Sequence, residues 1–123
     1  MLFRSNNQAT GGTTQIIDFE NLDASALSTG LTVTGSAAAN SIIGGSGNDV
    51  LVGDNADNVL RGSGGNDQLN GGLGSDVADY SYLSSGFTAT LNSSGTVTVV
   101  AATGDTDTLI SIENIREIGR AHV

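Results

Sequence analysis

Five side chains that could bind a metal recur at intervals of nine residues through the middle of the chain. They are Asn40, Asp49, Asn58, Asp67 and Asp76. Carboxylate and amide oxygens suit calcium, which takes roughly 6–8 oxygen ligands at 2.3–2.6 Å in proteins. Two of these carboxylates, brought together by a regular fold with backbone carbonyls beside them, would make a calcium site.

The residue types needed for most catalytic sites are missing. The chain has no Cys and no Lys, and His122, near its end, is the only histidine. Because His122 lies in a terminal segment that resembles translated adapter DNA, the natural segment is expected to have no imidazole or thiolate set for zinc and no histidine base for a serine triad. Acid pairs alone could serve a glycosidase, but the pairs here have the spacing of calcium ligands. We therefore expect no enzyme activity in this segment.

The five side chains each occupy position 6 of a nine-residue unit. The units read GSAAANSII (35–43), GGSGNDVLV (44–52), GDNADNVLR (53–61), GSGGNDQLN (62–70) and GGLGSDVAD (71–79). Position 1 is always Gly, which permits a tight turn, and positions 7 to 9 form a short strand whose middle residue points to one face. One unit cannot bury that residue alone, but stacked units can, as in a solenoid.

These units resemble the RTX (repeats-in-toxin) nonapeptide, glycine-glycine-x-glycine-x-aspartate-x-large apolar-x. Residues 44–52 match every defined position, whereas residues 71–79 carry a small Ala78 at position 8. The flanking segments FENLDASAL and GDTDTLISIENI also resemble segments that border such arrays. The resemblance implies an all-β fold, a parallel β-roll or β-solenoid, with turns alternating between two edges. It also implies that calcium lies between one turn and the turn two units later.

This alternation assigns the candidate ligands to two edges. Asp49 and Asp67 share one edge and predict the stronger calcium site, whereas Asn58 and Asp76 predict a weaker site on the other edge. Asn40 and Asn58 offer no charge, so we expect stacked amides that hydrogen-bond to the turns without a metal. The turn residues expected to complete the sites are Gly44, Ser46, Gly47, Gly62, Gly64, Gly65, Gly72 and Gly74.

Other acids are expected to have lesser roles. Asp54, Asp57 and Asp79 fall at positions 2, 5 and 9 and are expected to be surface charges. A sixth unit, ATGDTDTLI (102–110), places Asp107 at position 6 but lacks both leading glycines and stands apart from the array.

The composition limits the partners. The formal net charge of −9 repels nucleic acids and anionic membranes. No apolar run approaches the ~20 residues of a membrane span. A chain that is acidic, rich in Gly and poor in large apolar residues is either disordered or completed by cations. Calcium ions are thus the expected partner and cofactor.

The remaining sequence divides around the repeats. The expected organisation is an N-terminal β cap (6–34), five RTX-like nonapeptides (35–79) and a C-terminal β-hairpin and cap (80–116). Alternating apolar residues predict the hairpin strands at 87–91 and 96–101, and LISIENIREI (109–118) fits either a strand or a short helix. Tyr80 and Tyr82 are expected to pack on the end of the array.

The two ends resemble translated DNA. Residues 2–5 (LFRS) and 118–123 (IGRAHV) are what the two arms of a widely used short-read sequencing adapter encode. We therefore expect residues 1–5 and 118–123 to be a sequencing-adapter artefact, and the natural segment to be an internal piece of a longer protein.

The resemblance implies a calcium-binding module of a larger, secreted bacterial protein, exported by type I secretion machinery and folding on calcium outside the cell. Two alternatives fit the same residues. The segment could be the non-catalytic C-terminal tail of a secreted enzyme, such as a protease or lipase, or one repeat of an adhesin or surface protein.

Overall fold

The computed structural model describes residues 14–17 and 21–117, and within them the chain forms short β-strands and no helix. The strands are β1 (Thr14–Ile17), β2 (Asn21–Asp23), β3 (Leu31–Thr34), β4 (Ser41–Ile43), β5 (Val50–Val52), β6 (Val59–Arg61), β7 (Gln68–Asn70), β8 (Val77–Asp79), β9 (Phe87–Leu91), β10 (Val97–Ala101), β11 (Thr106–Ile110) and β12 (Asn114–Arg116). A helix able to cross a membrane is therefore absent from this part of the chain. The suspected adapter segments lie outside the described residues.

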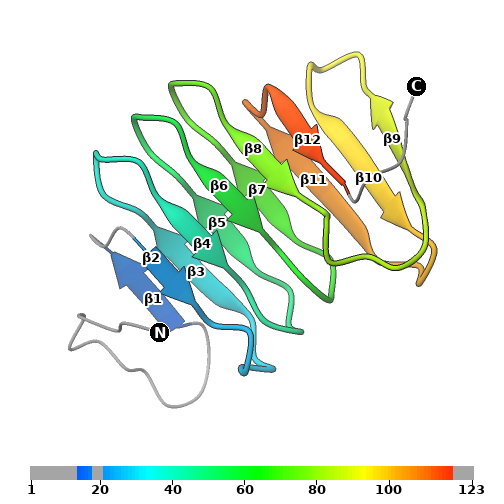
Figure 1. Cartoon of the computed structure of the whole chain (residues 1–123), viewed down its shortest axis with the longest axis horizontal. Coiled ribbons are helices and arrows are strands. Elements are labelled where there is room, and N and C mark those ends of the chain that lie inside the picture. Colours follow the sequence, from blue (N-terminus) through cyan, green and yellow to red (C-terminus); the bar gives the residue numbers. More distant parts are fainter. Residues whose placement is uncertain (1–13, 18–20, 118–123) are drawn as a thin grey trace.

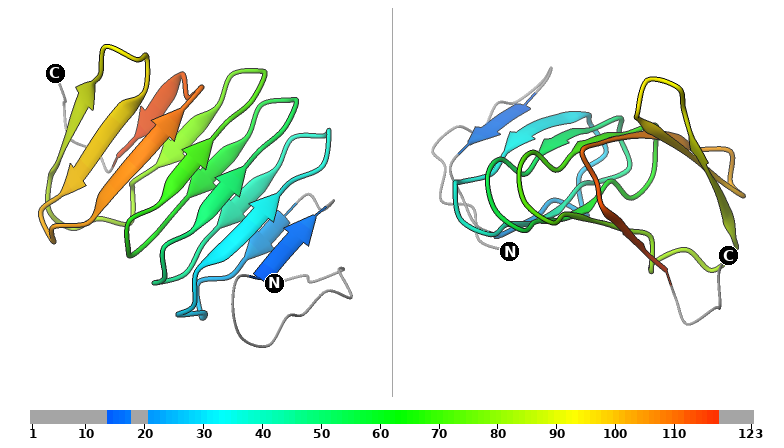
Figure 2. Two further views of the ribbon diagram at one scale, coloured as in Figure 1. Left: turned by 180° about the vertical axis from the view of Figure 1, so that it is seen from behind. Right: turned by 90° about the horizontal axis from the view of Figure 1, so that it is seen from above.

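Successive strands of the repeat region alternate between two sheets (Figure 1). One sheet has the order β1-β3-β5-β7-β11-β10-β9, and the other has the order β12-β8-β6-β4-β2. Each coil therefore contains one strand from each sheet and two turns, one at each edge. Figure 2 shows the coils stacked side by side, with β9 and β10 beyond β11 at the C-terminal end.

The coils are parallel and keep the nine-residue register. Leu51 of β5 lies opposite Leu69 of β7, and Ile42 of β4 lies opposite Leu60 of β6. Neighbours in a sheet are thus two nonapeptides apart, which confirms the predicted parallel β-roll.

The core of the roll consists mainly of one buried residue from each short strand. These residues form one column per sheet: Val33, Leu51, Leu69 and Leu109 in the first, and Leu22, Ile42, Leu60 and Ala78 in the second, each 2% exposed or less. Burying a Leu or Ile side chain stabilises a fold by about 1.5–3 kcal/mol. With one such residue per nonapeptide, the core of the repeats is thin.

The upstream segment continues the roll in the same register. Leu22 of β2 lies opposite Ile42, and Val33 of β3 lies opposite Leu51. Leu31, the first residue of β3, takes the position at which the nonapeptides carry Asn or Asp, and this leucine is buried.

The downstream segment leaves the roll and then returns to it. Strands β9 and β10 pair antiparallel, and β10 pairs antiparallel with β11. Strand β11 then joins the roll beside β7, with Leu109 opposite Leu69, and β12 joins beside β8, with Ile115 opposite Ala78. The segment LISIENIREI thus supplies two strands from opposite sheets within its described residues.

Aromatic residues close the C-terminal end of the core. Tyr80 is 2% exposed, and its ring centroid lies 5.1 Å from that of Phe87 and 6.1 Å from that of Tyr82. As expected, both tyrosines pack against the end of the nonapeptide array.

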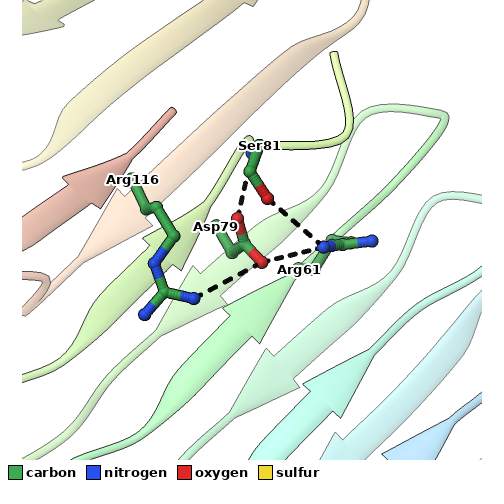
Figure 3. A network of polar contacts seen from close by, with 4 residues as sticks. All are labelled: Arg61, Asp79, Ser81 and Arg116. Carbon is green, nitrogen blue, oxygen red and sulfur yellow. Dashed lines mark hydrogen bonds and ion pairs between the residues drawn. The ribbon is translucent and has the colours of Figure 1, made fainter. Parts of the chain in front are cut away.

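A charge network ties the last nonapeptide to the terminal strand (Figure 3). Asp79 Oδ2 lies 2.9 Å from Arg61 Nη2 and 3.8 Å from Arg116 Nη1, and Asp79 Oδ1 accepts a hydrogen bond from Ser81 N at 2.9 Å. Burial opposes ionisation of Asp79, but the hydrogen bonds from Ser81 and Arg61 hold its pKa below the usual value. The expectation that Asp79 is a surface charge is wrong, because the residue is 6% exposed and paired.

Two nonapeptides carry an ordinary residue at position 2 in a conformation that favours glycine, and Asp54 is one of them, with φ of 79°. Ser63, at position 2, has φ of 74°, and Gly72 at the same position has φ of 85°. The left-handed region costs an ordinary residue roughly 1–2 kcal/mol. We expect Ser63→Gly to raise the free energy of unfolding by about 0.5–1 kcal/mol, after allowing for the greater entropy of glycine in the unfolded chain.

Urea unfolding in saturating calcium measures this effect. Ser46→Gly is the matched control, because Ser46 is a turn serine without a positive φ. A Ser63→Gly variant no more stable than the parent would contradict the strain argument.

Candidate metal centre

The position-6 side chains form two columns, one along each edge of the roll. The acidic column consists of Asp49 and Asp67, in the turns that lead into β5 and β7, and of Asp107, the second residue of β11. The mixed column consists of Asn40, Asn58, Asp76 and Glu113, in the turns that lead into β4, β6, β8 and β12. The structure thus brings together the predicted pair Asp49 and Asp67, and also the predicted pair Asn58 and Asp76.

Each carboxylate of the acidic column binds the backbone of the preceding coil. Asp49 Oδ1 accepts a hydrogen bond from Leu31 N at 2.9 Å, Asp67 Oδ1 accepts one from Asp49 N at 2.8 Å, and Asp107 Oδ1 accepts one from Asp67 N at 2.8 Å. All three aspartates are 3% exposed or less. The turns therefore hold these carboxylates at fixed places away from water.

The second carboxylate oxygens of this column differ in their partners. Asp49 Oδ2 accepts a hydrogen bond from Gly45 N at 3.0 Å, and Asp107 Oδ2 accepts one from the Tyr80 hydroxyl at 2.6 Å. Asp67 Oδ2 is buried and has no hydrogen-bond partner. A buried acceptor without a donor costs about 1–3 kcal/mol, and more if it is charged. The column therefore fits a cation, which would supply the missing partner.

The amide of Asn40 shows which oxygen atoms surround the second polar atom of a position-6 side chain, which is Nδ2 in asparagine and Oδ2 in aspartate. Its Nδ2 lies 2.7 Å from Ser36 O, 2.7 Å from Ala38 O, 2.8 Å from Gly53 O and 3.0 Å from Asn58 Oδ1. In the register of the repeat these are positions 2 and 4 of the same turn and positions 1 and 6 of the next coil. The expected hydrogen bonding of the stacked amides to the turns is therefore present.

The amide of Asn58 repeats this arrangement one coil further along. Its Nδ2 donates to Ala56 O at 2.8 Å, to Gly71 O at 3.2 Å and to Asp76 Oδ1 at 2.9 Å. Asp76 Oδ1 also accepts a hydrogen bond from Asn58 N at 2.8 Å. The carboxylate oxygen of Asp76 that faces Asn58 is thus already bound by two N–H groups.

The invariant glycine at position 1 makes room for the position-6 side chain. A methyl group at Gly62 would overlap Asp67 Oδ2, and a methyl group at Gly53 would overlap Asn58 Nδ2. The same holds for the pairs Gly35 and Asn40, Gly44 and Asp49, and Gly71 and Asp76. Oδ2 of each aspartate therefore occupies the place that Nδ2 occupies in each asparagine.

Burial changes the acidity of these carboxyl groups. Burial is the main cause that raises the pKa of Asp67 to about 8, and the nearby charges of Asp107 and Asp49 act in the same direction. Burial also raises the pKa of Asp49, Asp76 and Asp107. Without a cation, Asp67 therefore tends to hold a proton near neutral pH.

The predicted turn residues lie at the same edges as these columns. Gly62 O lies 2.7 Å from the position that a Cβ would take on Gly44, beside Asp49 Oδ2. Ser46 and Gly64 lie one above the other in consecutive turns, as do Gly47 and Gly65. Gly72 and Gly74 both have positive φ in the turn before Asp76.

Two column members were not assigned as ligands from the sequence. Residues 102–105 form the β10–β11 hairpin turn, so only Asp107 and the strand after it follow the repeat register. Glu113 ends a shortened connection between β11 and β12. The apolar Ile115, two residues after Glu113, marks the same spacing as positions 6 and 8 of a nonapeptide.

No three His, Cys, Asp or Glu side chains cluster within residues 14–17 and 21–117. A cation at either edge would therefore combine at most two carboxylates with backbone carbonyls. Such a set of oxygen ligands is what calcium accepts.

Comparison with known families agrees with this geometry. The family model for the RTX calcium-binding nonapeptide repeat (4 copies) matches residues 32–59 and 43–78. No curated protein and no solved structure matches the chain. The matched residues run from β3 into β8 and include the position-6 residues of all five nonapeptides. Over residues 32–78 this chain therefore carries the RTX calcium-binding nonapeptide repeat.

Proposed function

We propose that the chain is a calcium-binding β-roll module that folds when calcium binds outside the cell, within a larger secreted bacterial protein. The observation that carries the proposal is the acidic column itself, in which the buried carboxylates of Asp49, Asp67 and Asp107 stack along one edge and Asp67 Oδ2 has no hydrogen-bond partner. The module itself is non-catalytic, and type I secretion machinery is its export route.

The main site lies between the turns that contain Asp49 and Asp67. Because the coils share one register, the oxygen atoms around Asn40 Nδ2 indicate which oxygen atoms lie at the equivalent positions around Asp49. Around Asp49, the equivalent oxygens belong to Gly45, Gly47, Gly62 and the Asp67 side chain. A methyl group at Gly44 would overlap Asp49 Oδ2 and lie 2.7 Å from Gly62 O, so two of these oxygens are near neighbours.

A weaker site lies between Asn58 and Asp76. Here the amide of Asn58 already donates to Asp76 Oδ1 at 2.9 Å. An ion between these two residues has to displace that amide, and it gains only one carboxylate. The affinity of this site is therefore expected to be lower than that of the Asp49 and Asp67 site.

Calcium would supply positive charge where the turns place only oxygen atoms. The residues of the chain position the oxygen ligands. The glycines at position 1 leave space for the carboxylates, and the backbone N–H groups of the preceding coil orient one oxygen of each carboxylate. The ion therefore links two turns that the thin core alone holds weakly.

Calorimetric titration with calcium tests the main site. We expect binding with dissociation constants of about 10⁻⁶–10⁻³ M, the range of sensor and extracellular sites. Asp67→Asn is expected to lose the tightest binding step. Asp54→Asn also removes one negative charge, but from outside both columns, and it should keep that step. Unchanged binding in Asp67→Asn would refute the assignment of the site.

A further inference from the structure

Asp76 has one carboxylate oxygen that the nonapeptide array leaves without a partner. The residue is fully buried, and its Oδ1 accepts hydrogen bonds from Asn58 N and Asn58 Nδ2. Its Oδ2 has no hydrogen-bond partner. Because Oδ1 already accepts hydrogen bonds from the preceding coil, a partner for Oδ2 has to come from outside the nonapeptide array.

Oxygen atoms of the connection between β11 and β12 lie beside this carboxylate. A methyl group at Gly71 would overlap both Asp76 Oδ2 and Ser111 O, so these two oxygens are near neighbours. The Glu113 carboxylate is adjacent as well, since its Oε2 accepts a hydrogen bond from Asp76 N at 2.8 Å. Strand β12 follows at once and pairs in parallel with β8.

Asn58 shows what this arrangement lacks. Its Nδ2 donates to Ala56 O, Gly71 O and Asp76 Oδ1. One coil further along, the equivalent acceptors are Gly74 O, Ser111 O and the Glu113 carboxylate. Asp76 presents an oxygen to them where Asn58 presents an N–H donor, so acceptors face an acceptor.

We propose that Asp76, Glu113 and the Ser111 carbonyl form a divalent-cation site that joins the last nonapeptide to the terminal strand β12. Only hard oxygen ligands are present, two of them charged, and this set suits calcium. The site extends the proposed calcium-binding function, on which it rests, to a place outside the nonapeptide pattern. Glu113 replaces the aspartate, and three residues (111–113) replace the six-residue turn.

The chemistry of Glu113 suits this position. Its side chain is one methylene longer than that of aspartate, which gives it reach from the shortened connection. Glu113 is exposed, whereas Asp76 is fully buried. The site therefore has one wall in the protein interior and one side open to solvent, so an ion can enter and water can complete its ligands.

The acidic column ends differently at the same end of the roll. There Asp107 Oδ2 accepts a hydrogen bond from the Tyr80 hydroxyl at 2.6 Å. The second oxygen of Asp107 thus has a donor from the protein, whereas that of Asp76 does not. Of the two columns, the mixed column is the one that needs a cation at its C-terminal end.

Counting bound ions by native mass spectrometry in calcium tests the proposal. Glu113→Gln is expected to bind one calcium ion fewer than the full wild-type chain. Glu117→Gln is the matched control, with the same chemical change four residues away, and should keep the wild-type number. Asp76→Asn supplies an amide donor to the same acceptors, so it should stay folded, and it should lose at least one ion, because Asp76 also belongs to the weaker site with Asn58.

The outcomes separate this site from the proposed function. If Glu113→Gln keeps the wild-type count while Asp67→Asn loses an ion, the junction site is overturned and the main site stands. A wild-type chain that binds no calcium overturns both.

Discussion

In a chelator at neutral pH, the chain is expected to give a largely disordered circular dichroism spectrum, and added calcium is expected to produce a β-sheet spectrum. The metal-free fold has to bury Asp67 without a partner for Oδ2, beside the carboxylates of Asp49 and Asp107. Keeping a proton on a carboxyl whose pKa is raised from 3.8 to about 8 costs on the order of 5 kcal/mol near neutral pH. That cost approaches the whole stability of a small domain, about 5–15 kcal/mol.

Calcium is expected to reverse this balance. It binds the folded form only, and at a hundredfold excess over its dissociation constant it contributes about 2.7 kcal/mol per site. Magnesium should be much less effective, because it demands shorter bonds of about 2.0–2.1 Å and octahedral geometry. Equal hydrogen-exchange protection of residues 44–79 with and without calcium would contradict the folding switch, even if ions bind.

A single substitution separates charge from packing in this switch. Asp67→Asn places an amide where Asn40 and Asn58 already place theirs, above a position-1 glycine and among turn carbonyls. We expect Asp67→Asn to show more β-structure than the wild type in chelator and a smaller gain when calcium is added. A variant less folded than the wild type in chelator would show that the charge is not what destabilises the metal-free roll.

Acid is expected to substitute for calcium in part. In chelator, the chain should show more β-structure at about pH 5 than at about pH 8.5. An unfolded Asp67 has a pKa near 3.8, whereas burial raises it to about 8 in the fold. The stability contributed by the bound proton is fully present below about pH 4 and is lost as the pH rises through about 8. Asp49, Asp76 and Asp107 shift in the same direction.

Calcium should reverse the sign of this pH dependence, because protons compete with the ion for the carboxylates. Circular dichroism at both pH values, with and without calcium, measures the effect. Asp67→Asn should flatten the dependence in chelator, whereas Asp54→Asn should retain it. Identical metal-free spectra at the two pH values would contradict the prediction.

Much of the architecture follows from the sequence because the repeat is short and regular. A nine-residue period with Gly at position 1 and an apolar residue at position 8 predicts stacked turns and short strands. The resemblance to the RTX repeat adds that two units form one coil, so Leu51 and Leu69 stack as expected. The pairing of Asp49 with Asp67 follows from the same period, because successive turns alternate between two edges. The family match over residues 32–78 agrees with that pattern.

The structure of the flanking segments is harder to predict from the sequence, because their coils lack the glycine turns of the nonapeptides. Leu31 takes a position that carries Asn or Asp in the nonapeptides, and Glu113 reaches the mixed column from a connection half the usual length. Neither residue matches the repeat, yet backbone pairing with the neighbouring coil places both. Asp79, which fits a surface charge by its position, is buried because Arg61 and Arg116 approach it from neighbouring strands.

The sequence by itself determined the roll, its register and the two edges on which the Asp and Asn side chains stand. Only the tertiary structure decided which oxygen of each carboxylate is satisfied. One oxygen of Asp67 and of Asp76 binds the preceding coil, and the other depends on what the next coil brings. For Asp107 a tyrosine 27 residues away supplies that partner. Such contacts join residues distant in sequence, and a local repeat cannot encode them.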